Sequence, residues 1–111
     1  MSKGHELITR STESLLLCIL SEKPMYGYQI IKELHGRSDG YFNFKEGTLY
    51  PALHRLESEG LLQGKWEKLP NGQQRKYYYV TEKGHIKLLE KKDQWVDFLT
   101  AMNRIFQPAE I

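Results

Sequence analysis

A single hairpin signal, set among helical segments, constrains the fold of this chain more than any other feature. Asn71-Gly72 lies in the turn Pro70–Gln73, and Asn-Gly is the dipeptide that best suits a tight β-hairpin turn. The flanking segments Leu61–Leu69 and Gln74–Val80 contain Trp66 and a run of tyrosines, which predicts two strands. An isolated hairpin is not stable alone, so the rest of the chain must pack against it.

Three helices are predicted before the hairpin. Ser11 or Thr12 is expected to cap the first helix, which Pro24 ends because proline disfavours helix in the residue before it. Apolar residues at helical spacing predict the second helix over Tyr26–Leu34. The third is predicted over Glu46–Ser58, after a short extended piece that covers residues 41–44.

Two features at the helix ends need comment. Pro51 falls inside the third helical pattern, and proline is tolerated only in a first turn. Either this helix begins near Tyr50, or its N-terminal turn is irregular. Thr81 is expected to cap a long last helix that runs to about Gln107 and is ended by Pro108.

The predicted fold class is mainly α with a small β hairpin (α+β), arranged as a winged helix-turn-helix with a long C-terminal dimerisation helix. The expected organisation is a flexible arm over residues 1–10, the winged helix-turn-helix DNA-binding domain over 11–82, the dimerisation helix over 83–107 and a tail over 108–111. The apolar run Leu15–Leu20 is too short to cross a bilayer, and no signal-peptide pattern is present. We therefore expect a cytoplasmic protein without membrane contact.

Positive charge is concentrated in the hairpin region. The whole chain carries a net charge of only +2, but residues 61–87 hold six basic and two acidic residues, a net charge of +4. A local basic patch is what binding to a polyanion requires. A solvated hairpin with surface lysines would show the same charge, so charge alone does not distinguish a polyanion-binding surface from an ordinary solvated one.

The third helix and the hairpin supply the candidate DNA-binding residues. In a winged helix the third helix enters a major groove and the hairpin, or wing, lies along the backbone. The outer face of the helix and the wing offer hydroxyl, imidazole, amide and cationic groups for phosphates and base edges. The predicted contacts are Thr48, Tyr50, His54, Arg55, Gln73, Gln74, Arg75 and Lys76.

Each of these residues also has a purely structural interpretation. Tyr50 could pack against the wing, and Arg55 could pair with Glu59 one helical turn away. Strand alternation is expected to bury at least one of the three tyrosines at positions 77–79.

Three segments resemble the signature segments of PadR-type transcriptional regulators. They are Pro24–Tyr28, Gly47–Leu62 and Arg75–Gly84, and the resemblance extends in the same order over about Ser14–Phe106. It implies a winged helix, repression of nearby promoters and a homodimer built with the last helix. The single helix after the wing resembles the compact subfamily, whose members include regulators that bind flat aromatic drugs and regulators of phenolic-acid or membrane-stress responses.

The last helix is the predicted dimer element on its own sequence pattern as well. Leu88, Trp95, Leu99, Met102 and Phe106 follow steps of seven, four, three and four, which is a heptad-like seam. The small domain cannot cover so long a helix, so its free end is expected to pack on a second copy. The alternative is a helix folded back on the first helix of its own chain, and both can hold together.

Trp95 is the candidate ligand-binding residue. The resemblance implies a planar aromatic small-molecule effector stacked at this position, either a cation or a phenolic compound. Asp93 and Asp97 lie near Trp95 in sequence and could supply negative potential, although solvated side chains are the first expectation for both. A tryptophan that only fills the interface is the competing interpretation.

Other classes of protein find little support in the sequence. The histidines are scattered without a second ligand at metal spacing, and no glycine-rich phosphate loop is present. The only cysteine, Cys18, lies in an apolar helical run and is expected to be an inert thiol. We therefore expect no enzyme, no cofactor and no metal. The real competitor is a winged helix that serves only protein–protein contact.

Overall fold

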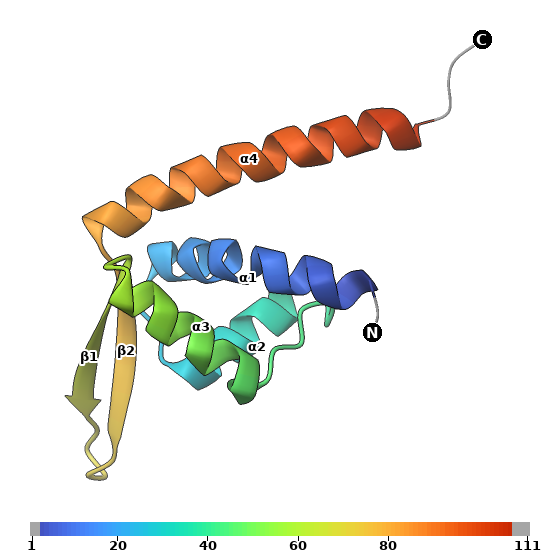
Figure 1. Cartoon of the computed structure of the whole chain (residues 1–111). Coiled ribbons are helices and arrows are strands. Elements are labelled where there is room, and N and C mark those ends of the chain that lie inside the picture. The colour runs from blue at the N-terminus through green and yellow to red at the C-terminus, as the bar shows by residue number, and fades with distance from the viewer. Residues whose placement is uncertain (1–2, 108–111) are drawn as a thin grey trace.

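The computed structural model describes residues 3–107, and the side chains from Arg10 onward. The elements follow in the order α1 (Lys3–Glu22), α2 (Gly27–Arg37), α3 (Glu46–Ser58), β1 (Leu62–Lys68), β2 (Gln74–Val80) and α4 (Glu82–Phe106). The first three helices form a compact body, the hairpin projects from one end of it, and α4 runs back along α1 on the other side (Figure 1). The predicted fold class is confirmed.

The core lies where α1, α2, α3 and the base of the hairpin meet. The helix α1 contributes a continuous apolar face because its buried residues recur at helical spacing, and α3 contributes a second face. The buried side chains from these two helices are Leu16, Leu17, Ile19, Leu20, Leu49, Ala52, Leu53 and Leu56. This core holds α3 against α1, and the side of α3 that faces away from the core is exposed to solvent.

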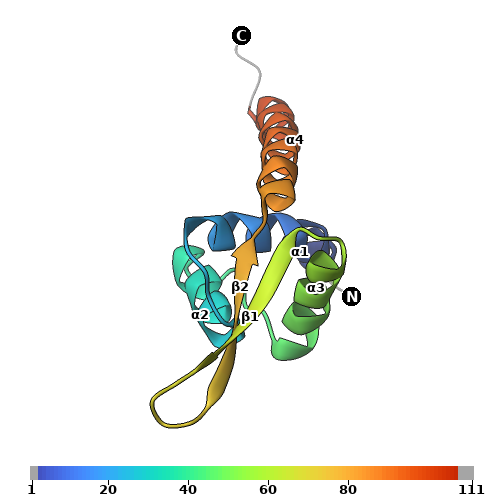
Figure 2. The ribbon, with the colours of Figure 1, turned by 90° about the vertical axis from the view of Figure 1, so that its left-hand side faces the viewer.

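The hairpin is attached to the helices through Tyr78. β1 and β2 pair antiparallel with Gly64 opposite Tyr78 and Trp66 opposite Lys76. The backbone N–H of Tyr78 donates to the Met25 carbonyl at 3.0 Å, and its ring is fully buried. One of the three neighbouring tyrosines is therefore buried, as strand alternation predicts, and α2 and α3 lie on either side of the hairpin (Figure 2).

The N-terminal arm was predicted wrongly. α1 begins at Lys3, so residues 3–10 are helical rather than a loose arm, and neither Ser11 nor Thr12 caps the helix. Thr12 is instead buried within it. Serine and threonine are only mildly unfavourable inside a helix, so their preference for caps did not locate the helix end. Residues 1, 2 and 108–111, including the predicted tail, lie outside the described residues.

The ambiguity over Pro51 is resolved in favour of the longer helix. α3 begins at Glu46, so the start near Tyr50 is wrong and Pro51 lies inside the helix. Its missing N–H would have donated to the carbonyl of Gly47, four residues earlier. Both residues are exposed, so water can satisfy that carbonyl.

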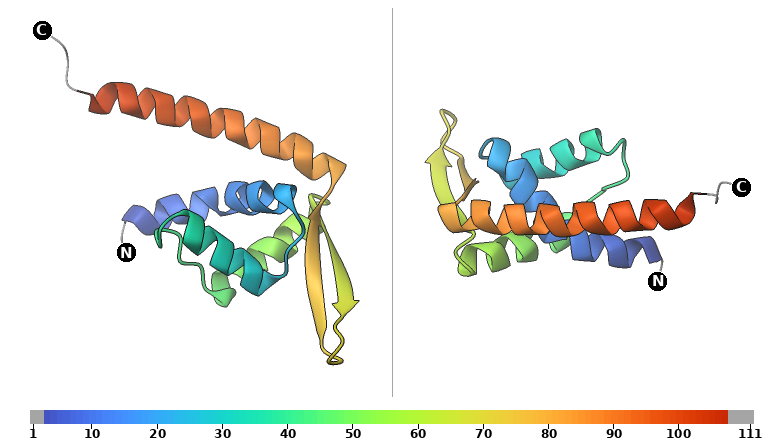
Figure 3. Two further views of the ribbon diagram at one scale, coloured as in Figure 1. Left: turned by 180° about the vertical axis from the view of Figure 1, so that it is seen from behind. Right: turned by 90° about the horizontal axis from the view of Figure 1, so that it is seen from above.

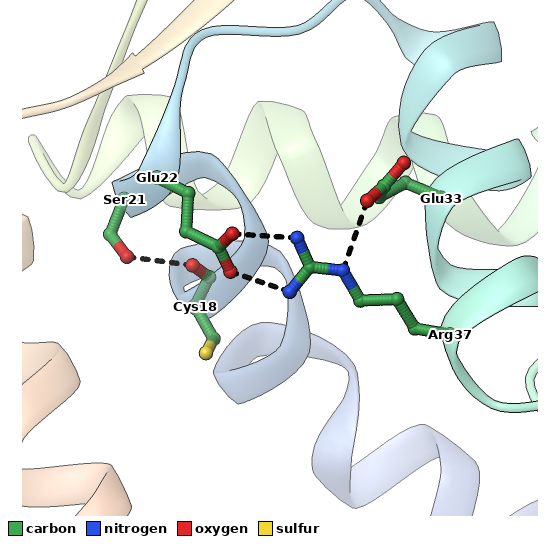
Figure 4. A network of polar contacts seen from close by, with 5 residues as sticks. All are labelled: Cys18, Ser21, Glu22, Glu33 and Arg37. Carbon is green, nitrogen blue, oxygen red and sulfur yellow. Dashed lines mark hydrogen bonds and ion pairs between the residues drawn. The ribbon is translucent and has the colours of Figure 1, made fainter.

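The ends of α1 and α2 are joined by an ion-pair network (Figure 4). The guanidinium of Arg37 donates to both carboxylate oxygens of Glu22 at 2.6 Å and to Glu33 at 2.9 Å. Two carboxylates on one guanidinium raise the pKa of Arg37 further and lower the pKa of Glu22. The network lies on the surface and orients α2 relative to α1.

Candidate nucleic-acid interface

The helix α3 presents three exposed sides around its buried face. Residues seven apart lie above one another, because seven residues make about two helical turns. Tyr50 and Glu57 therefore share the flank nearest the wing, and Thr48 and Arg55 share the opposite flank. Between them runs an outer ridge of exposed residues, Gly47, Pro51, His54 and Ser58.

The outer ridge is shaped for close approach to a groove. Gly47, Pro51 and Ser58 are small and carry little beyond the backbone, whereas His54 offers an imidazole at the middle of the ridge. A ridge of small residues lets a helix lie deep against another surface. His54 on the ridge and Thr48 on the neighbouring flank are both exposed, as predicted.

Tyr50 is half-buried and its ring packs against α2, whereas the structural alternative considered from the sequence was packing against the wing. Its ring lies against Gly27 at the start of α2, where a Cβ atom would overlap the Tyr50 hydroxyl. Gly27 is therefore required by the close approach of α2 and α3. The ring also lies beside His54, with ring centroids 6.4 Å apart.

A hollow of about 300 Å³ separates the wing from α2 and α3. It brings together five predicted contacts with four residues that sequence reasoning had not assigned to the site. Its lining consists of Tyr26, Gly27, Tyr50, His54, Trp66, Gln74, Arg75, Lys76 and Tyr78. Thr48, Arg55 and Gln73 do not line it, and Gln73 lies exposed at the wing tip.

Trp66 is the residue in this hollow that the sequence pattern could have revealed. It is directly opposite Lys76 in the hairpin, and opposite residues of an antiparallel pair project from the same face. That face also carries the buried Tyr78. Trp66 lies nearer the tip than Tyr78 and remains 66% exposed.

The two wing cations that were predicted to contact DNA, Arg75 and Lys76, make internal contacts. The guanidinium of Arg75 lies over the Tyr26 ring at 4.3 Å from its centroid. Lys76 Nζ donates to Glu57 Oε1 at 2.8 Å, while Glu57 Oε2 accepts from the backbone N–H of Gly64 at 3.2 Å. These bonds lower the pKa of Glu57 and raise that of Lys76. Glu57 therefore joins α3 to both strands of the wing.

Arg55 pairs with a residue that the sequence did not indicate. Its Nε donates to Glu13 Oε1 on α1 at 2.8 Å, rather than to Glu59, the partner considered as the structural alternative. The second oxygen of Glu13 lies 3.5 Å from Lys91 Nζ on α4. Burial opposes ionisation of Glu13, but the two cations outweigh it and lower its pKa. One carboxylate thus connects three helices.

A second hollow, of about 330 Å³, lies between α1 and α4. Trp95 is half-buried there, and its indole Nε1 donates to Ser14 Oγ at 3.0 Å. The lining consists of Arg10, Ser14, Lys91, Gln94, Trp95 and Phe98. Asp93 and Asp97 do not line it and are exposed, which agrees with the solvated state expected for them, and the charged residues in the lining are cations.

The seam of α4 divides into a covered half and an open half. Leu88 is buried in the core of its own chain, so its assignment to a dimer interface is wrong. Trp95 packs against α1, and Met102 is half-buried. Leu99 and Phe106 are exposed, together with Ile86, Leu89, Val96, Phe98 and Ile105. Figure 3 shows α4 crossing over α1 at an angle and diverging from it towards the C-terminal end.

None of the described helices is long and apolar enough to cross a membrane. Within residues 3–107, no three histidine, cysteine or acidic side chains gather as a metal site would require.

Several solved structures with the same arrangement are those of transcriptional regulators. Residues 16–90 match the model of the Transcriptional regulator PadR-like family. The structure of a transcriptional regulator from Clostridium thermocellum superposes with a TM-score of 0.84 at 27% identity, covering 96% of this chain and 99% of that one. A PadR-like transcriptional regulator from Bacillus cereus gives a TM-score of 0.82 at 32% identity, covering 94% and 99%. The transcriptional regulator Rv3488 of Mycobacterium tuberculosis is 34% identical over 74 residues, which are 65% of this chain and 64% of that protein.

Proposed function

Because the chain belongs to the PadR-like family of transcriptional regulators, we propose that it is a cytoplasmic homodimeric repressor that binds an inverted-repeat operator. Family membership makes it a DNA-binding regulator with a winged helix. The repressor role, the operator symmetry and release by a small-molecule or stress signal are parts of the proposal.

The observation that carries the DNA-binding mode is the outer ridge of α3 beside the projecting wing. The ridge is exposed over its whole length and its small residues permit close approach to base edges. The wing extends beyond the body on the side away from α4 (Figure 1). Its Lys65, Lys68 and Arg75 provide positive charge for a phosphate backbone on one side of the groove.

The exposed apolar stripe of α4 supports the dimer. Val96, Leu99 and Phe106 are 60%, 52% and 71% exposed, and apolar side chains gathered on one helix are typical of an interaction surface. A second copy of the same helix is the occupant that the heptad-like spacing favours. A twofold dimer would present two copies of α3 to successive major grooves and hence an inverted repeat.

Binding to random duplex DNA tests this function against a wing used only for protein contact. The affinity measured by fluorescence anisotropy should fall steeply between about 50 and 200 mM salt, because phosphate contacts release counterions. Arg75→Gln should weaken binding to every sequence and flatten the log–log salt slope by about 0.9 for each phosphate interaction that the substitution removes.

Lys92→Gln is the matched control, because it removes one exposed cation from α4, away from the wing. It should leave the slope unchanged. A wild-type protein that fails to bind random duplex at low salt would instead support the protein-contact module.

The hollow beside Trp95 supports a second part of the proposal, an effector site for a planar aromatic anion. Trp95 and Phe98 provide aromatic surface, with ring centroids 5.9 Å apart, and Arg10 and Lys91 provide positive charge. This lining favours a phenolate or aromatic carboxylate over the aromatic cation considered from the sequence. Stacking on an indole adds about 0.5–1.5 kcal/mol to burial.

Tryptophan fluorescence tests the effector site, because Trp66 and Trp95 are the two tryptophans of the chain. In Trp66→Phe, a planar aromatic carboxylate should quench Trp95 and release bound DNA. In Trp95→Phe the same compound should neither quench the remaining Trp66 nor release bound DNA. Quenching by an aromatic cation alone would contradict the charge argument, and no quenching by either compound at high micromolar concentration would show that Trp95 is a structural residue.

A further inference from the structure

We propose that Glu13 holds Arg55 in an ion pair that competes with a DNA phosphate, and that Lys91 on α4 sets how tightly Arg55 is held. The proposal rests on the proposed DNA-binding function and assigns it a route of regulation. It makes Glu13 a positioning residue, because it acts on DNA only through Arg55.

Arg55 has the freedom that such competition needs. Its side chain is 54% exposed, and Nε is the atom that donates to Glu13, at 2.8 Å. Among the described residues, its two terminal amino groups have no carboxylate partner. The pair is therefore monodentate, and although Glu13 is only 25% exposed, the Arg55 side of the pair faces solvent and can exchange partners.

The place of Arg55 on α3 gives it a phosphate to reach. It shares its flank with the exposed Thr48, on the side of the ridge opposite the wing. A helix in a major groove lies between two phosphate backbones. The wing serves the backbone on one flank, so Arg55 and Thr48 are the polar groups available to the backbone on the other.

Lys91 connects this pair to the effector hollow. It shares the Glu13 carboxylate with Arg55, at 3.5 Å from the second oxygen, and it also lines the hollow beside Trp95. Ser14, which follows Glu13 in the chain, accepts a hydrogen bond from the Trp95 indole. An anion in the hollow, or a shift of α4, would draw Lys91 away from Glu13. The full carboxylate charge would then act on Arg55 and reduce its availability to DNA, which is the sign that release of a repressor requires.

Removal of the carboxylate is the first test. Glu13→Gln should tighten binding to duplex DNA about threefold more than Glu90→Gln, the ordinary strength of the surface pair that is removed. It should also steepen the salt slope by about 0.9, for one added phosphate contact. Glu90 is the matched control, because it is an exposed glutamate that pairs with Lys87 within α4.

The double variant gives the readout that a merely structural role would not produce. In an Arg55→Ala background, the difference between Glu13→Gln and Glu90→Gln should disappear. If that difference persists without Arg55, or if the two glutamine variants bind DNA equally, the proposal is overturned. Circular dichroism and thermal unfolding of each variant establish that it is folded.

Lys91 provides a second arm that remains informative if Glu13→Gln does not fold. Lys91→Gln should weaken DNA binding about threefold more than Lys87→Gln, which removes the same charge from the same helix. Equal effects of the two would contradict the proposal. A wild-type protein that does not bind DNA at all overturns the proposed function, whereas DNA binding without these differences overturns this inference alone.

Discussion

At the scale of single residues, the wing is held onto α3 in part by Lys76, which sequence reasoning had predicted as a DNA contact. Lys76 and the Gly64 N–H both donate to Glu57, whose side chain is about one-third exposed. A carboxylate with two donors and little solvent is a strong acceptor. Lys76 therefore contributes to the stability of the wing whatever it does on DNA.

The Lys76–Glu57 pair predicts a pH-dependent contribution to stability. Because the folded-state pKa of Glu57 is lowered, its contribution is present above the unfolded pKa of about 4.3 and is lost as the pH falls through the folded value. Lys76→Met should lower the free energy of unfolding by about 1 kcal/mol at pH 7. The difference from wild type should shrink towards pH 3 in urea unfolding.

Lys83→Met is the control for this prediction. Lys83 Nζ donates at 2.9 Å to the backbone carbonyl of Glu59, which does not titrate. Its difference from wild type should stay constant from pH 7 to about pH 3, because only a titrating acceptor produces linkage. A Lys76 effect that is equally constant would show that the Glu57 charge is not the partner that matters.

At the scale of elements, local signals predicted most of the boundaries. α3 and β2 span the residues predicted for them, and β1 is shorter than predicted by one residue at each end. Thr81 caps α4, as predicted, because its hydroxyl accepts from the Gly84 N–H at 3.0 Å. Turn and capping residues act on neighbouring positions only, so the element boundaries that they set can be predicted from a single sequence. The start of α1 was missed because Ser11 and Thr12 provide a capping signal that the longer helix overrides.

The candidate site was less predictable than the fold. Periodicity and the turn signal placed Thr48, His54, Gln73 and Gln74 at exposed positions correctly, whereas Arg75 and Lys76 are half-buried. The partner of Arg55 could not be found in this way, because Glu13 is 42 residues away along the chain. The cationic lining of the Trp95 hollow likewise depends on how α1 and α4 meet, which no local pattern records.

The junction between the wing and α4 depends on Gly84. A Cβ at this position would overlap the backbone carbonyl of Leu61, which cannot move like a flexible side chain. Gly84→Ala should therefore cost about 1–3 kcal/mol of unfolding free energy, the usual range for overpacking. Urea or thermal unfolding measures it.

Gly36→Ala is the matched helical control. Gly36 lies in α2, and a Cβ there meets nothing within 4 Å. It should be neutral or stabilising by up to about 1 kcal/mol, because alanine is the better helix former. A Gly84→Ala protein as stable as Gly36→Ala would show that α4 can shift away from Leu61 without cost.

At the scale of the whole molecule, the protein is elongated, with extents of 66 × 28 × 23 Å. α1 lies between α4 on one side and α2 and α3 on the other (Figure 1). The proposed dimer surface and the proposed DNA surface therefore face away from each other, and neither would block the other.

Leu99→Asp tests the proposed dimer. Burying a charge without a partner is costly, so the variant should sediment as a monomer and lose affinity for an operator-length duplex while the monomer fold is retained. Ile86→Asp is the control, because Ile86 is similarly exposed, at 58%, but lies about 140° around α4. A Leu99→Asp protein that remains a dimer would place the seam elsewhere on the helix.

The short junction between β2 and α4 has a consequence for which operators the proposed dimer accepts. Only Thr81 separates the strand from the helix, and it is bound to the α3–β1 turn through the carbonyls of Gly60 at 2.6 Å and Leu61 at 3.1 Å. Because no flexible linker joins the two elements, the crossing angle of two α4 helices would fix the distance and the relative orientation of the two DNA-binding domains. One extra base pair between half-sites adds about 3.4 Å and rotates one half-site by roughly 35°. A rigid dimer cannot follow that rotation. The protein would therefore bind only operators with one spacing between half-sites, and this spacing would limit its choice of operator as strictly as the half-site sequence does.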